Sequence, residues 1–181
     1  MKRFFVTLAA LLFSFSAFAL TPEQVVVFKA ALQAETDPVL VEYRTNGQTP
    51  HIKQWYDAAA APDYIVWKTS VTQDEITQNG FDWVQVDSLT VGKARIWEWL
   101  FDNQQTAINP SKVNVRAGID EAWTGTTAML AVRAAVYVHC KRPASRIEKL
   151  FSTGSGTDGS PSTTVTDLSF TENDVTLALQ P

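Results

Sequence analysis

The sequence is short of the side chains that build disulfides, metal centres and reactive nucleophilic pairs. Its 181 residues include one cysteine, Cys140, and two histidines, His51 and His139. A single cysteine excludes a disulfide within the chain, and the three side chains lack the spacing of a zinc site. We therefore expect no metal and no other cofactor. Small exported domains often depend on disulfides, but a chain of this length can bury enough apolar surface without them.

Basic residues are scarce as well. The chain has 15 lysines and arginines against 19 aspartates and glutamates, and its formal net charge is −4. Proteins that bind nucleic acid neutralise its phosphates with a basic face, so nucleic acid is an unexpected partner here. With 45% hydrophobic and 19% charged residues, the composition instead indicates a folded globular domain.

Hydrophobic runs long enough to cross a membrane are also missing. The longest apolar stretch, residues 4–18, is interrupted by a threonine and two serines. A membrane span needs about 20 apolar residues, so we expect no stable membrane span. The stretch instead has the length of the apolar part of a secretory signal.

The first nineteen residues have the three parts of such a signal. Lys2 and Arg3 form the positive end, and Ala17-Phe18-Ala19 is a small-x-small cleavage site. Cleavage after Ala19 predicts a periplasmic or secreted protein that begins at Leu20. The alternative is that translation starts near Leu20, which would leave the protein in the host cytoplasm or in a virion.

Repeated capping motifs are the main feature that is present, and they predict a mainly helical fold. A threonine is followed by proline, or by Gln, Glu or Asp three positions on, as in helix N-terminal caps and capping boxes. Helices are expected to begin after Thr21, after Thr49, after Thr72, near Ser88 or Thr90, after Asn109-Pro110, at Thr126 or Thr127, in the segment 144–151, and after Thr171.

Signals for strands and loops are few. YIVWKTSV (64–71) is the best strand candidate, and FDWVQVDSLT (81–90) is expected to be an extended link. The Gly- and Ser-rich segment 154–164 is expected to be a flexible loop. Pro143 should kink or break the helix that begins at Thr126 or Thr127. The sequence thus predicts one helical domain over residues 20–181. We expect a compact bundle of about seven helices with extended connectors and at most a minor β element.

Two groups of residues are candidates for an interface. The segment KRPASRIEK carries four basic residues: Lys141, Arg142, Arg146 and Lys149. They either form a patch for phosphate, nucleic acid or an acidic partner, which in a virion protein would be a subunit contact, or complement the end of a helix and pair with Glu148. Trp97 and Trp99 lie about 200° apart on a helix, so they cannot share one face. Trp99 or Trp83 is therefore expected at an interface, where aromatic residues are favoured.

No catalytic residues are assigned. A Cys–His nucleophile pair needs its side chains within hydrogen-bonding reach, whereas adjacent residues such as His139 and Cys140 point about 100° apart on a helix. We expect Cys140 to be a packing residue. An enzyme that uses Cys140 is the weakest functional hypothesis.

Nearly all of residues 20–178 resembles a family of uncharacterised proteins of tailed bacteriophages and prophages. The similar stretches include LTPEQ, VWKTSVT, NGFDWVQVDSLTVGKARIWEWLFDN, INPSKVNVRAGIDEAW, HCKRPASRIEKLFSTGSGTDGSP and SFTENDV. The resemblance implies a structural or morphogenesis role near the head–tail junction and supplies no catalytic residues. Members of this family begin close to LTPEQ, so the signal-like segment departs from their pattern.

Two main functional hypotheses follow. The first is a non-enzymatic phage or prophage protein that binds virion proteins, neighbouring phage proteins or copies of itself. The second takes the signal at face value and predicts a periplasmic helical factor of prophage origin that binds an envelope component.

Overall fold

The computed structural model describes residues 20–102, 107–165 and 168–181, and the signal-like segment 1–19 lies outside these residues. The described parts contain nine α-helices and two sheets of two strands each. The prediction of a mainly helical fold with a minor β element is confirmed. In the described part of the chain, no helix has the length and apolar character needed to cross a membrane.

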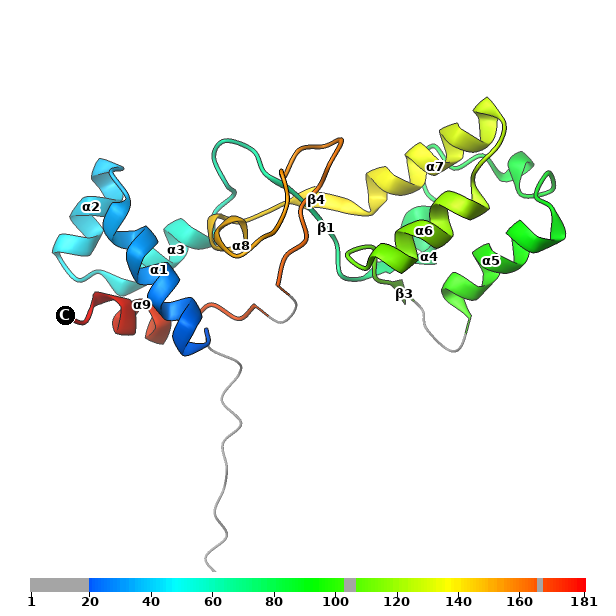
Figure 1. The fold of residues 1–181 in the computed structure, drawn as a ribbon. Helices are drawn as coiled ribbons and strands as arrows, with labels where there is room; N and C mark the ends of the chain where they lie inside the picture. The colour runs from blue at the N-terminus through cyan, green and yellow to red at the C-terminus, as the bar shows by residue number, and fades with distance from the viewer. Residues whose placement is uncertain (1–19, 103–106, 166–167) are drawn as a thin grey trace, which may run out of the picture.

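Helices from both ends of the described chain form one lobe, called here the terminal lobe (Figure 1). Its members are α1 (Pro22–Ala34), α2 (Pro38–Thr45), α3 (Thr49–Asp57), α8 (Arg146–Leu150) and α9 (Glu172–Leu179). Leu20, Phe28, Tyr56 and Val175 belong to its buried core. The rings of Phe28 and Tyr56 meet edge to face with 4.9 Å between centroids. This core ties α1 and α3 to α9, although they lie far apart in the sequence.

The middle of the sequence forms a second lobe, called here the middle lobe. Its members are β2 (Val71–Thr72), α4 (Gln73–Ile76), the 3₁₀ helix η1 (Trp83–Gln85), α5 (Val91–Phe101), β3 (Ala107–Ile108), α6 (Val113–Ala122) and α7 (Thr127–His139). The rings of Phe81, Trp97 and Trp123 pack together at its centre, with Trp97 and Trp123 centroids 5.3 Å apart. Ile119 and Val136 complete the buried side of α6 and α7.

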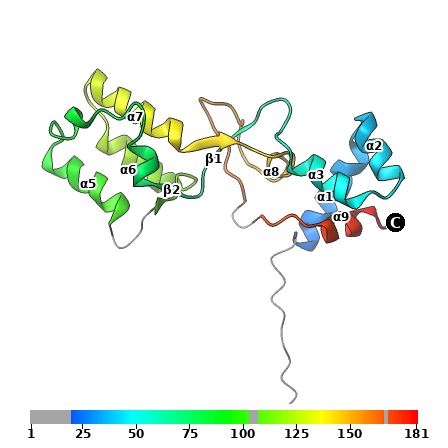
Figure 2. The same cartoon turned by 180° about the vertical axis from the view of Figure 1, so that it is seen from behind.

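An antiparallel ribbon of β1 (Ile65–Trp67) and β4 (Lys141–Pro143) runs between the two lobes (Figures 1 and 2). The predicted break at Pro143 is present: α7 ends at His139, and β4 separates it from α8. The physical reason is Pro143, which disfavours helical geometry at the residue before it and offers no N–H of its own.

Most of the predicted caps are confirmed. Thr21, Thr72 and Thr171 each accept a hydrogen bond from the third helical residue, and each forms a complete capping box. The cap predicted at Asn109-Pro110 is wrong, since α6 begins at Val113. The Asn109 carboxamide accepts instead from the backbone N–H of Ser111 at 3.0 Å, so its side chain closes a turn before the helix.

Two segments expected to lack regular structure are more ordered than predicted. The segment 81–90 contains η1, which is capped by Asp82. The segment 154–164 is hydrogen-bonded to its surroundings: Gly156 accepts from the N–H of Ile65 at 2.7 Å, and Thr163 pairs with Thr153. These bonds fix the loop to the ribbon between the lobes.

Candidate functional site

Four exposed large apolar side chains of the middle lobe lie on η1 and α5, while Val113 on α6 and Val138 on α7 are also exposed. Trp83 is 60% exposed, Val84 71%, Val91 77% and Trp99 70%. We call these four residues the η1–α5 surface. Both views place α5 at the end of the middle lobe away from the terminal lobe (Figures 1 and 2). A partner could therefore reach this end without contacting the terminal lobe.

The orientation of α5 explains why one tryptophan is buried and its neighbour exposed. Trp97 points into the middle lobe, where its ring meets Trp123 and Phe101. Trp99 is two residues further on, about 200° around the helix, and so points to solvent. Glu98 and Arg95 are exposed beside Trp99. An aromatic side chain with charged neighbours is the usual arrangement of an interface anchor and its polar rim.

Trp83 is held differently. Its ring packs edge to face on the buried ring of Phe81, with 4.9 Å between centroids. The 3₁₀ turn of η1 presents Val84 beside it, also exposed. Both Trp83 and Trp99 are exposed, and their place at an interface stays a prediction.

The basic residues of the predicted 141–149 patch lie on two elements and face partners within the chain. On β4, the Lys141 ammonium donates to the Asp158 carbonyl at 2.8 Å and lies 3.2 Å from its carboxylate. The Arg142 guanidinium donates two hydrogen bonds to the Glu148 carboxylate, one of them 2.8 Å long. These two pairs hold β4 against the loop that carries Asp158 and against α8.

The two basic residues of α8 also have internal partners. The Arg146 guanidinium stacks over the Trp55 ring, with its central carbon 4.1 Å from the centroid, and donates to the Trp55 carbonyl at 2.7 Å. The Lys149 ammonium lies 5.6 Å from the centroid of the Tyr64 ring. All four basic residues thus contact other segments of the chain. Only Arg142 pairs with Glu148 as the second interpretation expects, and Lys141 and Arg142 lie on β4 and not at a helix end.

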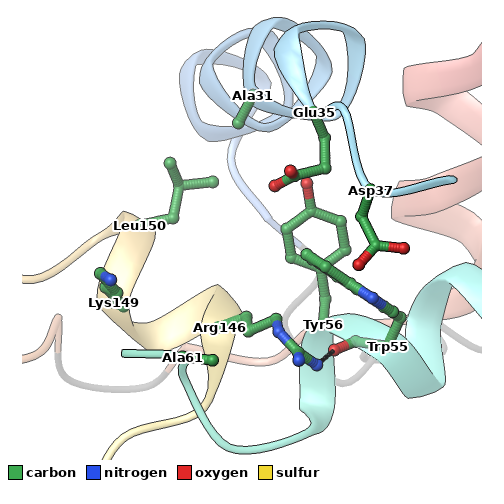
Figure 3. A pocket seen from close by; sticks show the side chains of 9 residues that line it. All are labelled: Ala31, Glu35, Asp37, Trp55, Tyr56, Ala61, Arg146, Lys149 and Leu150. Atoms are coloured by element: carbon green, nitrogen blue, oxygen red, sulfur yellow. Dashed lines mark hydrogen bonds between the residues drawn. The ribbon is translucent and has the colours of Figure 1, made fainter. Parts of the chain in front are cut away.

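A cavity of about 530 Å³ opens beside Arg146 in the terminal lobe (Figure 3). Glu35 and Asp37, from the junction of α1 and α2, line one side, and Arg146 lines the other. Trp55 and Tyr56 of α3 lie between them. Burial, followed by the nearby negative charge of Glu35, raises the pKa of Tyr56 to about 12. The phenol therefore stays protonated at neutral pH, and the cavity offers both signs of charge around an aromatic wall.

No pattern in the sequence indicates this cavity. Its lining residues come from segments that lie far apart in the sequence. Arg146 faces Glu35 and Asp37 across the cavity only because α8 packs against α3 in the folded chain.

Cys140 lies in the core of the middle lobe and is fully buried, as expected. Burial raises the pKa of its thiol to about 12, so the thiol stays protonated at neutral pH. The Nε2 atom of His139 lies 3.3 Å from the Asn79 carbonyl. Among the described residues, no cluster of three His, Cys, Asp or Glu side chains could hold a metal ion.

The chain matches no known protein-family model, no curated protein and no solved structure. The resemblance to phage proteins therefore stays a prediction.

Proposed function

We propose that this chain is a non-enzymatic structural or morphogenesis protein of a tailed bacteriophage or prophage. It acts by docking its η1–α5 surface onto a virion protein or onto another copy of itself. The observation that carries the proposal is the 70% exposure of Trp99 on a helix whose other tryptophan is buried. The resemblance over residues 20–178 supports a partner in the particle, with the head–tail junction as the finer location.

Physical chemistry favours a protein as the partner. A tryptophan side chain can bury about 150–250 Å² of surface, and interface hot spots are enriched in this residue. Nucleic acid is disfavoured by the net charge of −4 and by the internal partners of Lys141 and Arg142. A specific contact of about 1,200–2,000 Å² would need the apolar side chains of both η1 and α5 at its centre.

The test replaces the two exposed tryptophans. Trp83→Ser and Trp99→Ser should each weaken self-association in sedimentation velocity, or incorporation into purified particles, by at least about tenfold. Val26→Ser is the matched control, because Val26 is 68% exposed on α1 in the terminal lobe. It should leave both readouts unchanged.

Two results would contradict this function. One is a chain that is monomeric at high concentration and missing from purified particles. The other is a pair of tryptophan variants that associate as strongly as the unaltered chain.

A second candidate function rests on the cavity of the terminal lobe. We propose, as the alternative, a periplasmic factor that binds an envelope component carrying both an ammonium and a carboxylate group. Glu35 and Asp37 would face the ammonium, and Arg146 with Lys149 would face the carboxylate. Stem peptides of the bacterial cell wall carry both groups and serve as the probe.

Calorimetric titration with such a peptide tests this alternative. Binding should weaken at least about tenfold in Glu35→Gln, which removes one charge from the cavity. Glu42→Gln, an exposed change on α2, is the control and should bind as before. Absence of binding to the unaltered chain, together with a cytoplasmic location, would eliminate this candidate.

A further inference from the structure

The buried carboxylate of Asp174 accepts a hydrogen bond from the backbone nitrogen of Leu20, the first residue that the structure describes. The Leu20 nitrogen donates to Asp174 Oδ1 at 3.1 Å, across 154 positions of sequence. Asp174 is 0% exposed, and Leu20 is only 7% exposed, with its side chain in the core of the terminal lobe. Figure 1 shows the start of α1 beside α9, which carries Asp174 in its first turn. The nitrogen of residue 20 is therefore held in a fixed, dry position.

The remaining partners of Asp174 are neutral. Its Oδ2 atom accepts from the backbone N–H and from the hydroxyl of Thr171, both at 2.7 Å. Across the described parts of the chain, no lysine, arginine or histidine forms an ion pair with Asp174. A fully buried carboxylate is costly unless it is hydrogen-bonded, and a cation in contact with it offsets more of that cost. The Leu20 nitrogen already bonds Asp174, and it would become such a cation if the peptide bond before it were cleaved.

The sequence contains a predicted cleavage site at which hydrolysis would give this nitrogen a positive charge. The small-x-small motif Ala17-Phe18-Ala19 ends directly before Leu20. Hydrolysis of the Ala19–Leu20 bond adds one water: its hydroxyl goes to the Ala19 carbonyl, which becomes a carboxylate. The Leu20 nitrogen keeps the electron pair of the broken bond and takes up protons to become an ammonium. An α-amino group with an ordinary pKa of about 7.7–8.0 is mostly charged at pH 7.

We propose that Asp174 is the binding site for the α-ammonium group of Leu20, which forms when a signal peptidase cleaves after Ala19. The amide already lies at hydrogen-bonding distance, so the ammonium can form a charge-assisted bond without rearrangement. The ion pair joins the start of α1 to the first turn of α9. Cleavage therefore stabilises the terminal lobe, and the processed chain is more stable than its precursor. This inference rests on the export assumed by the periplasmic alternative, and its tests do not involve the η1–α5 surface or the cavity of the terminal lobe.

The first experiment measures the intact mass of the full chain after expression in a bacterium with an export pathway. The expected mass is that of a chain beginning at Leu20. A mass that begins at Met1, or that has methionine in place of Leu20, overturns the cleavage.

The second experiment is a double-mutant cycle between the terminal amine and Asp174. The chain beginning at Leu20 is compared with the same chain acetylated at its N-terminus, each with Asp174 intact or with the substitution Asp174→Asn. With Asp174 intact, the free amine should lower the unfolding equilibrium constant at least about tenfold relative to the acetylated form. In the Asp174→Asn background, the two forms should differ less than about twofold, because the charge attraction is gone.

Asp37→Asn is the matched control for this cycle. Asp37 caps α2 with the same kind of carboxylate hydrogen bonds, to the N–H groups of Val39 and Leu40, but does not contact Leu20. It should leave the full tenfold effect of the amine in place. Equal stability of the amine and acetylated forms, or the same difference between them with and without the Asp174→Asn substitution, overturns the site. A merely structural aspartate would give that result, because the acetylated nitrogen also donates.

A third measurement does not depend on whether Asp174→Asn folds. The Leu20 amine should react with acetic anhydride at least about tenfold more slowly in the folded chain than in urea, because the ammonium is buried and paired. Exposed amines such as that of Lys112 serve as internal references. A Leu20 amine that reacts as fast in the folded chain as in urea overturns the site.

Discussion

At the scale of single residues, Gly156 is the glycine at which an added Cβ would make the closest contacts. Its φ is +67°, and a Cβ added there would lie 2.2 Å from two ring carbons of Tyr64. The Tyr64 hydroxyl in turn donates to the Gly154 carbonyl at 3.0 Å and accepts from the buried Ser162 hydroxyl at 2.7 Å. The ring cannot move aside without breaking these bonds, so the loop and the ribbon depend on glycine at this position.

We expect Gly156→Ala to destabilise the chain more than the same change at Gly47. Gly47 has nearly the same φ, +64°, but nothing lies within 4 Å of an added Cβ. The backbone term alone should cost about 1 kcal/mol at Gly47, and the clash with Tyr64 should add about 1–3 kcal/mol at Gly156. Urea denaturation of both variants measures the difference. Equal losses would show that Tyr64 moves freely.

Cys140 gives a second prediction at this scale. Because burial raises the pKa of its thiol to about 12, iodoacetamide should label the folded chain slowly at pH 7. Labelling should accelerate in urea in proportion to the unfolded fraction. Rapid labelling of the folded chain would show that the thiol is accessible as a thiolate, and it would revive the enzyme hypothesis.

At the scale of elements, the short helix α8 depends on one ion pair. Burial opposes ionisation of Glu148, but hydrogen bonds from Arg142 and from the Ser145 backbone outweigh it and hold the pKa of the carboxyl below its usual value of 4.5. A lowered folded-state pKa adds stability that is fully present above about pH 4.5 and is lost as the pH falls through the folded-state value. The link between β4 and α8 therefore weakens in acid.

Glu148→Gln should reveal this link. Glutamine keeps the capping acceptor of α8 but removes the charge. We expect the free energy of unfolding to fall by about 1–2 kcal/mol at pH 7, allowing for solvent screening, and by much less at pH 3. Urea denaturation at the two pH values checks it.

Glu75→Gln is the control for Glu148→Gln. Glu75 holds the same capping position on α4 and faces Lys68, but its side chain is 42% exposed, against 20% for Glu148. Glu75→Gln should therefore lower the free energy of unfolding at pH 7 by less than Glu148→Gln does. A pH-independent loss in Glu148→Gln would contradict the role assigned to the ion pair.

At the scale of the whole molecule, the described residues bury most of their large apolar side chains in two separate clusters. One contains Phe28 and Ile52 in the terminal lobe, and the other contains Ile119 and Trp123 in the middle lobe. The ribbon of β1 and β4 runs between them (Figure 1). Burial energy is local to each cluster, so each lobe can lose stability without the other.

We expect Phe28→Ala to cost about 3–5 kcal/mol and to act mainly on the terminal lobe. Hydrogen exchange should speed up in α1, α3 and α9, while α5 to α7 keep their protection. Ile119→Ala is the reciprocal variant and should expose the middle lobe instead. If either variant accelerates exchange evenly through both lobes, the two clusters unfold as one cooperative unit.

The functional surfaces were predictable in part. The exposure of Trp99 follows from its spacing to Trp97, because helical geometry puts the two on opposite sides. The partners of Lys141 and Arg146 could not be predicted, since Asp158 and Trp55 lie 17 and 91 positions away. A cluster of basic residues in the sequence cannot indicate which of its charges face solvent.

The sequence by itself determined where most helices begin. A cap such as that of Thr72 involves only the four residues up to Glu75, so its geometry is set by local chemistry. Tertiary structure alone decided that residues after Cys140 form a strand, because their partner is Ile65–Trp67. It also decided that Asp174 is buried against Leu20, since that contact exists only when α1 and α9 pack together. Contacts between distant segments depend on the whole folded chain, whereas a helix start depends on one turn.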